Sequence, residues 1–371
     1  MNLIARFAGL FAALASVAPA QEMPRFIDLS RDSLRQVIVD REPGQYLGHP
    51  TTVLLDDQQT LLCVYPKGHG KGAIVYKRST DGGLTWSDRL PTPENWSSSL
   101  ETPTIHKVRT PEGKSRLLLF SGLYPIRISR SDDLGESWSP LEPIGSYGGI
   151  VAMSSLTQLP DGTLAAFFHD DGRFLHEVPR KLDKPQFIVY KVTSTDSGIT
   201  WSEPAPVAMH PEAHLCEPGL VYSPDRTQMA LLLRVNSRKF NSFVIFSNNA
   251  SISWSAPREV NPALTGDRHT AQYATDGRLL VSFRDTLKGS PTHGDWVAWV
   301  GTYDDILQGR PGQYRVRLMD NTKGADCAYP GVEVLPDGTF VLTTYGHWTQ
   351  DEPPYIVSVR LKLSELDALA K

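Results

Sequence analysis

Apolar segments of strand length recur in pairs along the chain, and a short polar turn separates the two members of each pair. Such a pair is typical of a β-hairpin, and several of the turns contain Asp-Gly, which favours tight turns between strands. The six pairs lie at residues 49–65, 102–121, 153–169, 217–234, 268–284 and 329–345. Because no long helical period interrupts them, the pattern predicts an all-β protein.

A second repeat of eight residues, the Asp box, follows the pattern S-x-D-x-G-x-[ST]-W. Three intact copies and one degenerate copy occupy residues 79–86, 131–138, 194–201 and 247–254. In the degenerate copy, Asn249 and Ser251 replace the Asp and the Gly. The Asp can accept hydrogen bonds from turn amides, the Gly can adopt a positive φ, and the Trp can pack between sheets. We therefore predict a structural role for this motif.

Together the two repeats predict a six-bladed β-propeller of four-stranded antiparallel blades with Asp-box turns. Each hairpin would supply two strands of a blade, and the segment that follows it would complete the sheet. One domain would then cover residues 21–371. We expect the early strand at residues 35–40 to pair beside the last strand at 355–363 and so close the ring.

The first twenty residues have the pattern of an export signal. Arg6 provides a basic start, an apolar run covers residues 7–17, and Ala18-Pro19-Ala20 matches a cleavage site. The apolar run is too short to span a bilayer, and no second run of spanning length follows. We therefore predict a signal peptide at residues 1–20, a secreted or periplasmic location, and no membrane span.

Charge and cysteine content limit the partners and cofactors that this chain is expected to bind. A formal net charge of -4 at pH 7 argues against a nucleic-acid partner. Three cysteines exclude a disulfide scaffold, and their spacing matches no zinc site, so we expect neither a metal nor another cofactor. Cys216 and Cys327 lie next to the candidate residues Glu217 and Tyr329, which leaves a bridge between them as a hypothesis. The sequence does not indicate the oligomeric state.

Propeller geometry brings equivalent positions of the six hairpins together. Because the innermost strand of each blade lines the central channel, residues at its start form a ring around one axis. The first strands begin at His49, Thr102, Ser154, Glu217, Arg268 and Tyr329. The second strands end at Tyr65, Ser121, His169, Arg234, Arg284 and Tyr345. These polar and ionisable residues predict a solvated funnel with converging side chains.

With these motifs, the chain resembles the sialidase superfamily over residues 45–365. The resemblance implies that Tyr329, in the segment AYPGV, is the nucleophile and that Glu217, in the segment CEPGL, is its base. It also implies that Arg234 and Arg284 clamp the carboxylate of the substrate, because a guanidinium can donate two parallel hydrogen bonds. Arg268 is a further candidate for substrate binding.

Two residues of the family pattern are missing from the first blade. Gly48 stands where the family has an arginine, and the loop at residues 65–72 has no carboxylate to act as general acid. His69 or His49 could supply the acid instead, and Lys67 or Lys71 could hold an anionic group. An ordinary solvated basic loop is an equally good interpretation.

The end of the third hairpin and a group of tryptophans provide further candidates. His169, Asp170 and Arg173 are predicted to bind substrate, and Asp170 or Asp171 could supply the missing acid. An Asp-Asp-Gly segment is, however, more often simply a turn. Three tryptophans could stack on sugar faces, although core packing is the simpler interpretation: Trp296, Trp299 and Trp348.

The resemblance implies a secreted exo-glycosidase that hydrolyses a terminal acidic sugar, sialic acid or a relative, from glycans. An acidic carbohydrate or glycoconjugate is therefore the expected partner. Two alternatives stay open. One is a lyase or unusual hydrolase for uronic-acid polysaccharides, in which His and Tyr move protons. The other is a propeller that binds glycans without catalysis, because a fold does not establish a reaction.

Overall fold

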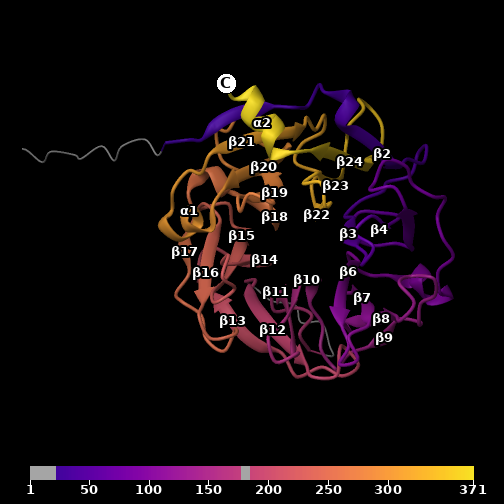
Figure 1. Cartoon of the computed structure of the whole chain (residues 1–371). Helices are drawn as coiled ribbons and strands as arrows, with labels where there is room; N and C mark the ends of the chain where they lie inside the picture. The colour runs from indigo at the N-terminus through magenta and orange to yellow at the C-terminus, as the bar shows by residue number, and fades with distance from the viewer. Residues whose placement is uncertain (1–21, 177–183) are drawn as a thin grey trace, which may run out of the picture.

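Six β-sheets stand around a central axis in the computed structural model, which describes residues 22–176 and 184–371 (Figure 1). The sheets follow one another around the ring in chain order, from indigo near the start to yellow near the end. The strands nearest the axis are β3, β6, β10, β14, β18 and β22. The predicted six-bladed β-propeller is confirmed. The predicted signal peptide lies outside the described residues.

The first three blades are built from consecutive strands. Blade 1 contains β3 (Thr51–Leu54), β4 (Leu61–Pro66) and β5 (Ile74–Ser79). Blade 2 contains β6 (Thr104–Arg109), β7 (Ser115–Ser121), β8 (Arg127–Ser131) and β9 (Glu142–Pro143). Blade 3 contains β10 (Ile150–Gln158), β11 (Leu164–Asp170), β12 (Ile188–Ser194) and β13 (Ala205–Met209).

The other three blades include the two strands from the start of the chain. Blade 4 contains β14 (Leu215–Tyr222), β15 (Met229–Val235), β16 (Phe243–Ser247) and β17 (Arg258–Glu259). Blade 5 contains β18 (Gly266–Tyr273), β19 (Leu279–Asp285), β20 (Trp296–Gly301), β21 (Tyr314–Met319) and β1 (Arg25–Asp28). Blade 6 contains β22 (Gly331–Val334), β23 (Phe340–Gly346), β24 (Tyr355–Leu361) and β2 (Gln36–Asp40).

Two blades depart from the predicted four strands. Blade 1 has three strands, and after its Asp box the chain forms a short helix at Glu94–Ser98 in place of a fourth strand. Blade 5 has five, because β1 adds to β21 in parallel. The described helices are short and connect strands or end the chain: η1 (Ser33–Arg35), η2 (Glu94–Ser98), η3 (Pro262–Leu264), α1 (Tyr303–Gln308) and α2 (Leu363–Leu369).

The ring closes where the start of the chain pairs with its end. β2 runs antiparallel to β24, with Gln36 opposite Val359, as the sequence predicts for residues 35–40 and 355–363. β24 ends at Leu361, and the chain then turns into α2. The two ends of the domain therefore stabilise each other.

Apolar side chains fill the spaces between neighbouring blades, and aromatic residues are the largest of them. Trp296 and Trp299 are fully buried, and Trp348 packs against the same cluster as Trp296. These three tryptophans therefore belong to the core and do not form a sugar-stacking surface.

All three cysteines are free thiols buried in the protein. Cys216 Sγ lies 3.8 Å from the carbonyl oxygen of Arg234, and Cys327 Sγ lies 3.1 Å from that of Gly294. The hypothesis of a bridge between Cys216 and Cys327 is therefore wrong, because each sulfur contacts a backbone oxygen of its own instead.

The Asp boxes form the turns that their residues predict. Asp81 Oδ1 accepts hydrogen bonds from the backbone N–H groups of Leu84 (3.0 Å) and Thr85 (2.9 Å), and its Oδ2 accepts one from the Thr85 hydroxyl (2.6 Å). Gly83 has a φ of 81°, a conformation that favours glycine. In the degenerate copy, Asn249 accepts the corresponding backbone bond from Ser253 at 3.0 Å. The structural role of the motif is thus explained by its own hydrogen bonds.

Replacing Asp81 with Asn is expected to lower the free energy of unfolding by about 1 kcal/mol at neutral pH, because charge-assisted hydrogen bonds are lost. Burial opposes ionisation, but hydrogen bonds led by that of Thr85 lower the pKa of Asp81 to about 2. A depressed pKa stabilises the fold above the unfolded value near 4, and this stabilisation fades as the pH falls towards 2.

Urea unfolding of the wild-type protein and of Asp81→Asn at about pH 7 and about pH 3 measures this effect. The difference between the two proteins should shrink at the lower pH. The exposed Asp88 provides the control, since Asp88→Asn should change little at either pH. A difference that stays constant with pH would show that the charge of Asp81 does not contribute.

Candidate active site

Four residues close to the starts of inner strands have a left-handed backbone. The positive φ values are 54° at His49, 48° at Glu217, 57° at Arg268 and 55° at Ala328. In blade 4, the pairing register also shifts between Cys216 and Gly219, which marks a β-bulge. Left-handed residues and bulges re-aim side chains and occur preferentially at functional sites. These strand starts therefore direct polar groups to the centre of the ring.

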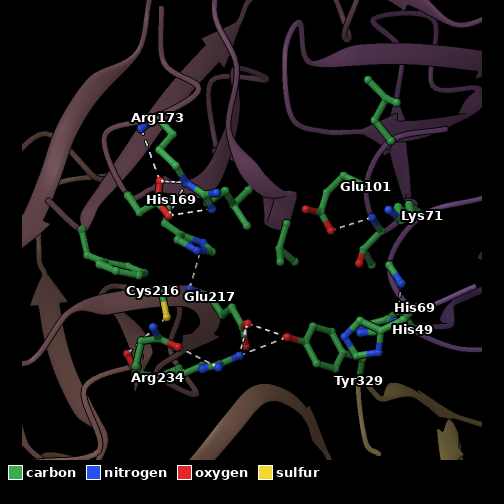
Figure 2. Close-up of a pocket in the computed structure, with 18 residues that line it drawn as sticks. His49, His69, Lys71, Glu101, His169, Arg173, Cys216, Glu217, Arg234 and Tyr329 are labelled. Carbon is green, nitrogen blue, oxygen red and sulfur yellow. Dashed lines mark hydrogen bonds and ion pairs between the residues drawn. The ribbon is translucent and has the colours of Figure 1, made fainter. Parts of the chain in front are cut away.

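A cavity of about 400 Å³ lies at these strand starts, within the size range of small-molecule sites. Blades 1, 2, 3, 4 and 6 contribute to its wall. The residues predicted from sequence that line it are His49, His69, Lys71, Thr102, His169, Asp171, Arg173, Glu217, Arg234 and Tyr329. The structure thus gathers residues from distant parts of the chain around one space (Figure 2).

Tyr329 and Glu217 are joined at one end of the cavity (Figure 2). Tyr329 Oη donates a hydrogen bond of 2.6 Å to Glu217 Oε1. Arg234 Nη1 donates to the same carboxylate oxygen (2.5 Å) and to Tyr329 Oη (3.2 Å). Burial and the charge of Glu217 raise the pKa of Tyr329, whereas the pKa of Glu217 is lowered, despite burial, by the charge of Arg234. The phenol therefore keeps its proton at rest, and the carboxylate is placed to accept it.

Two buried histidines hold the backbone around this pair. His49 Nδ1 accepts a hydrogen bond from the N–H of Gly70 (3.1 Å), and His169 Nδ1 accepts one from that of Glu217 (3.4 Å). The His49 ring also lies edge-on to Tyr329, with the ring centroids 4.4 Å apart. Burial lowers the pKa of both histidines, that of His169 to about 4. Both rings are therefore neutral at neutral pH.

His69 reaches the cavity from the first-blade loop and is mostly exposed, with 66% of its side chain accessible. Its Nδ1 lies 2.7 Å from Tyr46 Oη and 3.4 Å from Asp326 Oδ1. Asp326 also binds Tyr46 (2.7 Å) and His347 (3.1 Å). This cluster ties the first-blade loop to blade 6.

Glu101 presents a further carboxyl group to the cavity, and the sequence prediction did not include it. Figure 2 shows it across the open space from Glu217 and Tyr329. A Cβ atom on Gly70 would lie 3.4 Å from Glu101 Oε1, so this carboxyl group lies against the loop that lacks an acid of its own. Burial raises the pKa of Glu101 and favours its protonated form. The sequence did contain a signal, because Glu101 directly precedes Thr102 of the predicted ring.

Asp267 lies outside the cavity lining and forms ion pairs with three arginines. Arg238 donates to it at 2.6 Å and 2.7 Å, Arg284 at 3.1 Å and 2.5 Å, and Arg234 Nε lies 3.2 Å from it. The Asp267 side chain is fully buried. Although burial opposes ionisation, the charges of Arg234 and Arg284 hold the pKa of Asp267 well below its ordinary value. Arg238 was not among the predicted site residues.

Two predicted substrate-binding residues of the loops do not line the cavity. Lys67 forms an ion pair with Glu42 at 3.1 Å. Asp170 accepts hydrogen bonds from the N–H groups of Gly172 (2.7 Å) and Phe174 (3.1 Å). Asp170 therefore stabilises the turn that follows it, and Lys67 is held by its ion pair with Glu42.

Two predicted arginines are also absent from the cavity lining. Arg268 is buried and donates from Nη1 to the carbonyl oxygen of Ser154 at 2.8 Å. Arg284 is buried and binds Asp267 and backbone carbonyl groups. Arg234 is therefore the arginine of the predicted clamp that borders the cavity.

Two further features of residues 22–176 and 184–371 concern metals and membranes. No group of three or more His, Cys, Asp or Glu side chains in these segments is arranged to hold a metal ion. None of the helices in the same segments combines the length and the apolar character needed to cross a bilayer.

Known proteins with a related sequence or backbone include sialidases. The chain is 29% identical over 142 residues to an anhydrosialidase of Macrobdella decora. The aligned segment covers 36% of this chain and 17% of that relative. The NanB sialidase of Streptococcus pneumoniae superposes with a TM-score of 0.62 at 12% identity, over 89% of this chain and 71% of the other. The chain is a sialidase-like six-bladed β-propeller.

A protein of unknown function from Dyadobacter fermentans shares this sialidase-like propeller, with a TM-score of 0.69, 14% identity, and coverage of 89% of this chain and 98% of the other. No protein-family model matches the chain. At these identities, the structural matches establish the fold, while the reaction must be argued from the site.

Proposed function

We propose that this sialidase-like propeller is an exo-acting glycosidase that releases a terminal acidic sugar from glycans. The observation that carries the proposal is the 2.6 Å hydrogen bond from Tyr329 to Glu217 at the wall of the cavity. A tyrosine is a weak nucleophile on its own and needs an adjacent base. A cavity of about 400 Å³ suits the end of a glycan better than an extended chain.

In the proposed first step, Tyr329 Oη attacks the anomeric carbon of the sugar while its proton passes to Glu217. The glycosidic oxygen takes a proton from Glu101 and leaves, which produces a glycosyl-tyrosine intermediate. In the second step, the Glu101 carboxylate accepts a proton from water, which attacks the anomeric carbon. Tyr329 then leaves and recovers its proton from Glu217. Two displacements at one carbon retain the configuration of the sugar.

Arg234 and the choice of a tyrosine fit this chemistry. The hydrogen bond from Arg234 to Tyr329 Oη stabilises the negative charge that develops there when the intermediate breaks down. A neutral phenol also repels an anionic sugar less than a carboxylate nucleophile would. Three cationic side chains line the cavity: Lys71, Arg173, which pairs with Asp171 at 2.8 Å, and Arg234, which pairs with Glu217 at 2.5 Å.

We assign the general acid to Glu101 in place of the predicted His69. Burial raises the pKa of Glu101, which favours the protonated form, and the side chain faces the nucleophile across the cavity. His69 is mostly exposed and is bound to Tyr46 and Asp326, so its role is to position the first-blade loop. Export stays a prediction, because residues 1–20 lie outside the described part of the chain.

A panel of fluorogenic glycosides of acidic sugars tests the proposal, with the anomeric configuration of the first-formed product followed by NMR. We expect turnover of at least one acidic glycoside with retained configuration. An unsaturated, ultraviolet-absorbing product from uronic polysaccharides would instead identify a lyase. Binding of these glycans without any turnover would identify a non-catalytic propeller.

A further inference from the structure

The arginines bound to Asp267 limit where the acidic group of the substrate can bind. They are Arg234, Arg238 and Arg284. A carboxylate on the reacting carbon needs a guanidinium beside Tyr329 with two parallel N–H donors to spare. The resemblance implies that three arginines would bind such a carboxylate, namely Arg234, Arg284 and one at position 48. The contacts of these positions show how many donors the protein leaves free.

The donors of Arg284 are used within the protein. Its Nε and Nη2 both bind Asp267, at 3.1 Å and 2.5 Å. Its Nη1 binds the carbonyl oxygens of Ala325 (2.5 Å) and Cys327 (3.3 Å). Because a guanidinium has five N–H groups, one is left, and the side chain does not line the cavity. Arg284 is therefore not available to a substrate carboxylate.

Arg234 borders the cavity but is almost as fully engaged. Its Nη1 donates to Glu217 and Tyr329, its Nη2 donates to Asn236 at 2.8 Å, and its Nε faces Asp267 at 3.2 Å. Nε forms no hydrogen bond, but it is buried against Asp267, so a single Nη2 hydrogen remains for a group in the cavity. One accessible hydrogen cannot form the two parallel bonds of a carboxylate clamp.

Position 48 cannot supply the third arginine, because an aromatic ring fills its place. A Cβ atom on Gly48 would lie 2.5 Å from Tyr46 Cε1 and 3.3 Å from Tyr345 Cδ2. Tyr46 is fixed there by its 2.7 Å hydrogen bond to Asp326. Side chains are thus excluded from the space where the clamp would be completed.

We infer that the sugar that seats against Tyr329 is an aldopyranose whose anionic group is remote from the reacting carbon, and that it is not a 2-keto acid such as sialic acid. This inference rests on the proposed glycosidase function. Two further cationic side chains line the cavity from opposite walls (Figure 2) and are placed to meet that anionic group: the exposed Lys71, and Arg173, whose Nε and Nη2 also bind Asp171. A carboxylate at C6 of a uronic acid and a sulfate ester share the required chemistry.

Turnover by the wild-type protein distinguishes the sugar classes. The substrates are 4-methylumbelliferyl glycosides of N-acetylneuraminic acid, of glucuronic acid in both anomers, and of a 6-sulfated hexose in both anomers. We expect kcat/KM for one of the aldosides to exceed that for the sialoside at least about 100-fold. Whether the glucuronides or the 6-sulfated hexosides are turned over identifies the anionic group that the protein recognises.

Equal or faster cleavage of the sialoside, with retained configuration, would overturn this inference and leave the proposed glycosidase standing. Calorimetry provides a second measurement that does not depend on turnover. We expect 2,3-dehydro-2-deoxy-N-acetylneuraminic acid, a 2-keto acid analogue, not to bind at millimolar concentration, and either glucuronic acid or glucose 6-sulfate to bind. Binding of the analogue and of neither aldose would overturn the inference even in a protein that cleaves no glycoside.

Discussion

Tyr329→Phe is expected to lower kcat/KM by on the order of 10⁴-fold or more, because removing a nucleophile leaves only binding and electrostatic effects. The substitution removes one hydroxyl group and keeps the ring that packs edge-on to His49. The lost hydrogen bond to Glu217 should cost about 1–3 kcal/mol of folding stability. Initial rates on the best glycoside of the panel, together with a thermal melt, measure both effects.

Tyr273→Phe is the matched control, because Tyr273 also donates a hydrogen bond through its hydroxyl group, to the carbonyl oxygen of Tyr222 at 2.6 Å. It lies at the opposite end of β18 from the strand starts that form the site. The control should keep wild-type kcat/KM. Retention of activity in Tyr329→Phe on the same substrate would remove Tyr329 from the mechanism.

Glu101→Gln is expected to reduce kcat/KM by roughly 10²- to 10⁴-fold on glycosides with a poor leaving group, as loss of a general acid does. Substrates with an acidic phenol as leaving group need little protonation, so their rates should fall far less. This dependence on the leaving group distinguishes a proton donor from a residue that only shapes the cavity. Glu112→Gln, at an exposed position, serves as the control.

The pH profile tests the same assignment. Burial raises the pKa of Glu101, and a general acid acts in its protonated form, so activity should fall as the pH rises through that raised value. In Glu101→Gln this alkaline decline should disappear. If the variant kept both the wild-type decline and its rate on poor leaving groups, the acid would have to be sought elsewhere, with His69 as the next candidate.

The fold could be predicted from local chemistry because each blade repeats it. Turn residues such as Asp81 and Gly83 act within a few positions of each other, so a short motif contains everything that its turn needs. The three-stranded first blade shows the limit of such an argument. There the segment after the Asp box forms a short helix, although the fourth strands of blades 2 and 3 tolerate Pro143 and Pro206.

The core of the site could also be predicted, because equivalent positions of a radial array must meet. Glu217, Arg234 and Tyr329 occupy repeat positions, and the structure joins them by hydrogen bonds. Arg284 occupies such a position as well, but it turns to a partner instead of the cavity. A repeat position determines where the backbone of a residue lies, but it does not determine which neighbouring side chain forms an ion pair with that residue.

The sequence by itself thus determined the ring, its turns and the convergence of the inner strand starts on one axis, since short motifs and radial repetition suffice for these. The pairing of Tyr329 with Glu217 was implied by the resemblance to the sialidase superfamily. Only the tertiary structure decided that Glu101 faces the nucleophile, that Asp267 holds the arginines and that Tyr46 fills the place of a missing one. Those outcomes depend on contacts between side chains of different blades. Burial makes such contacts strong, and the linear order of residues does not contain them.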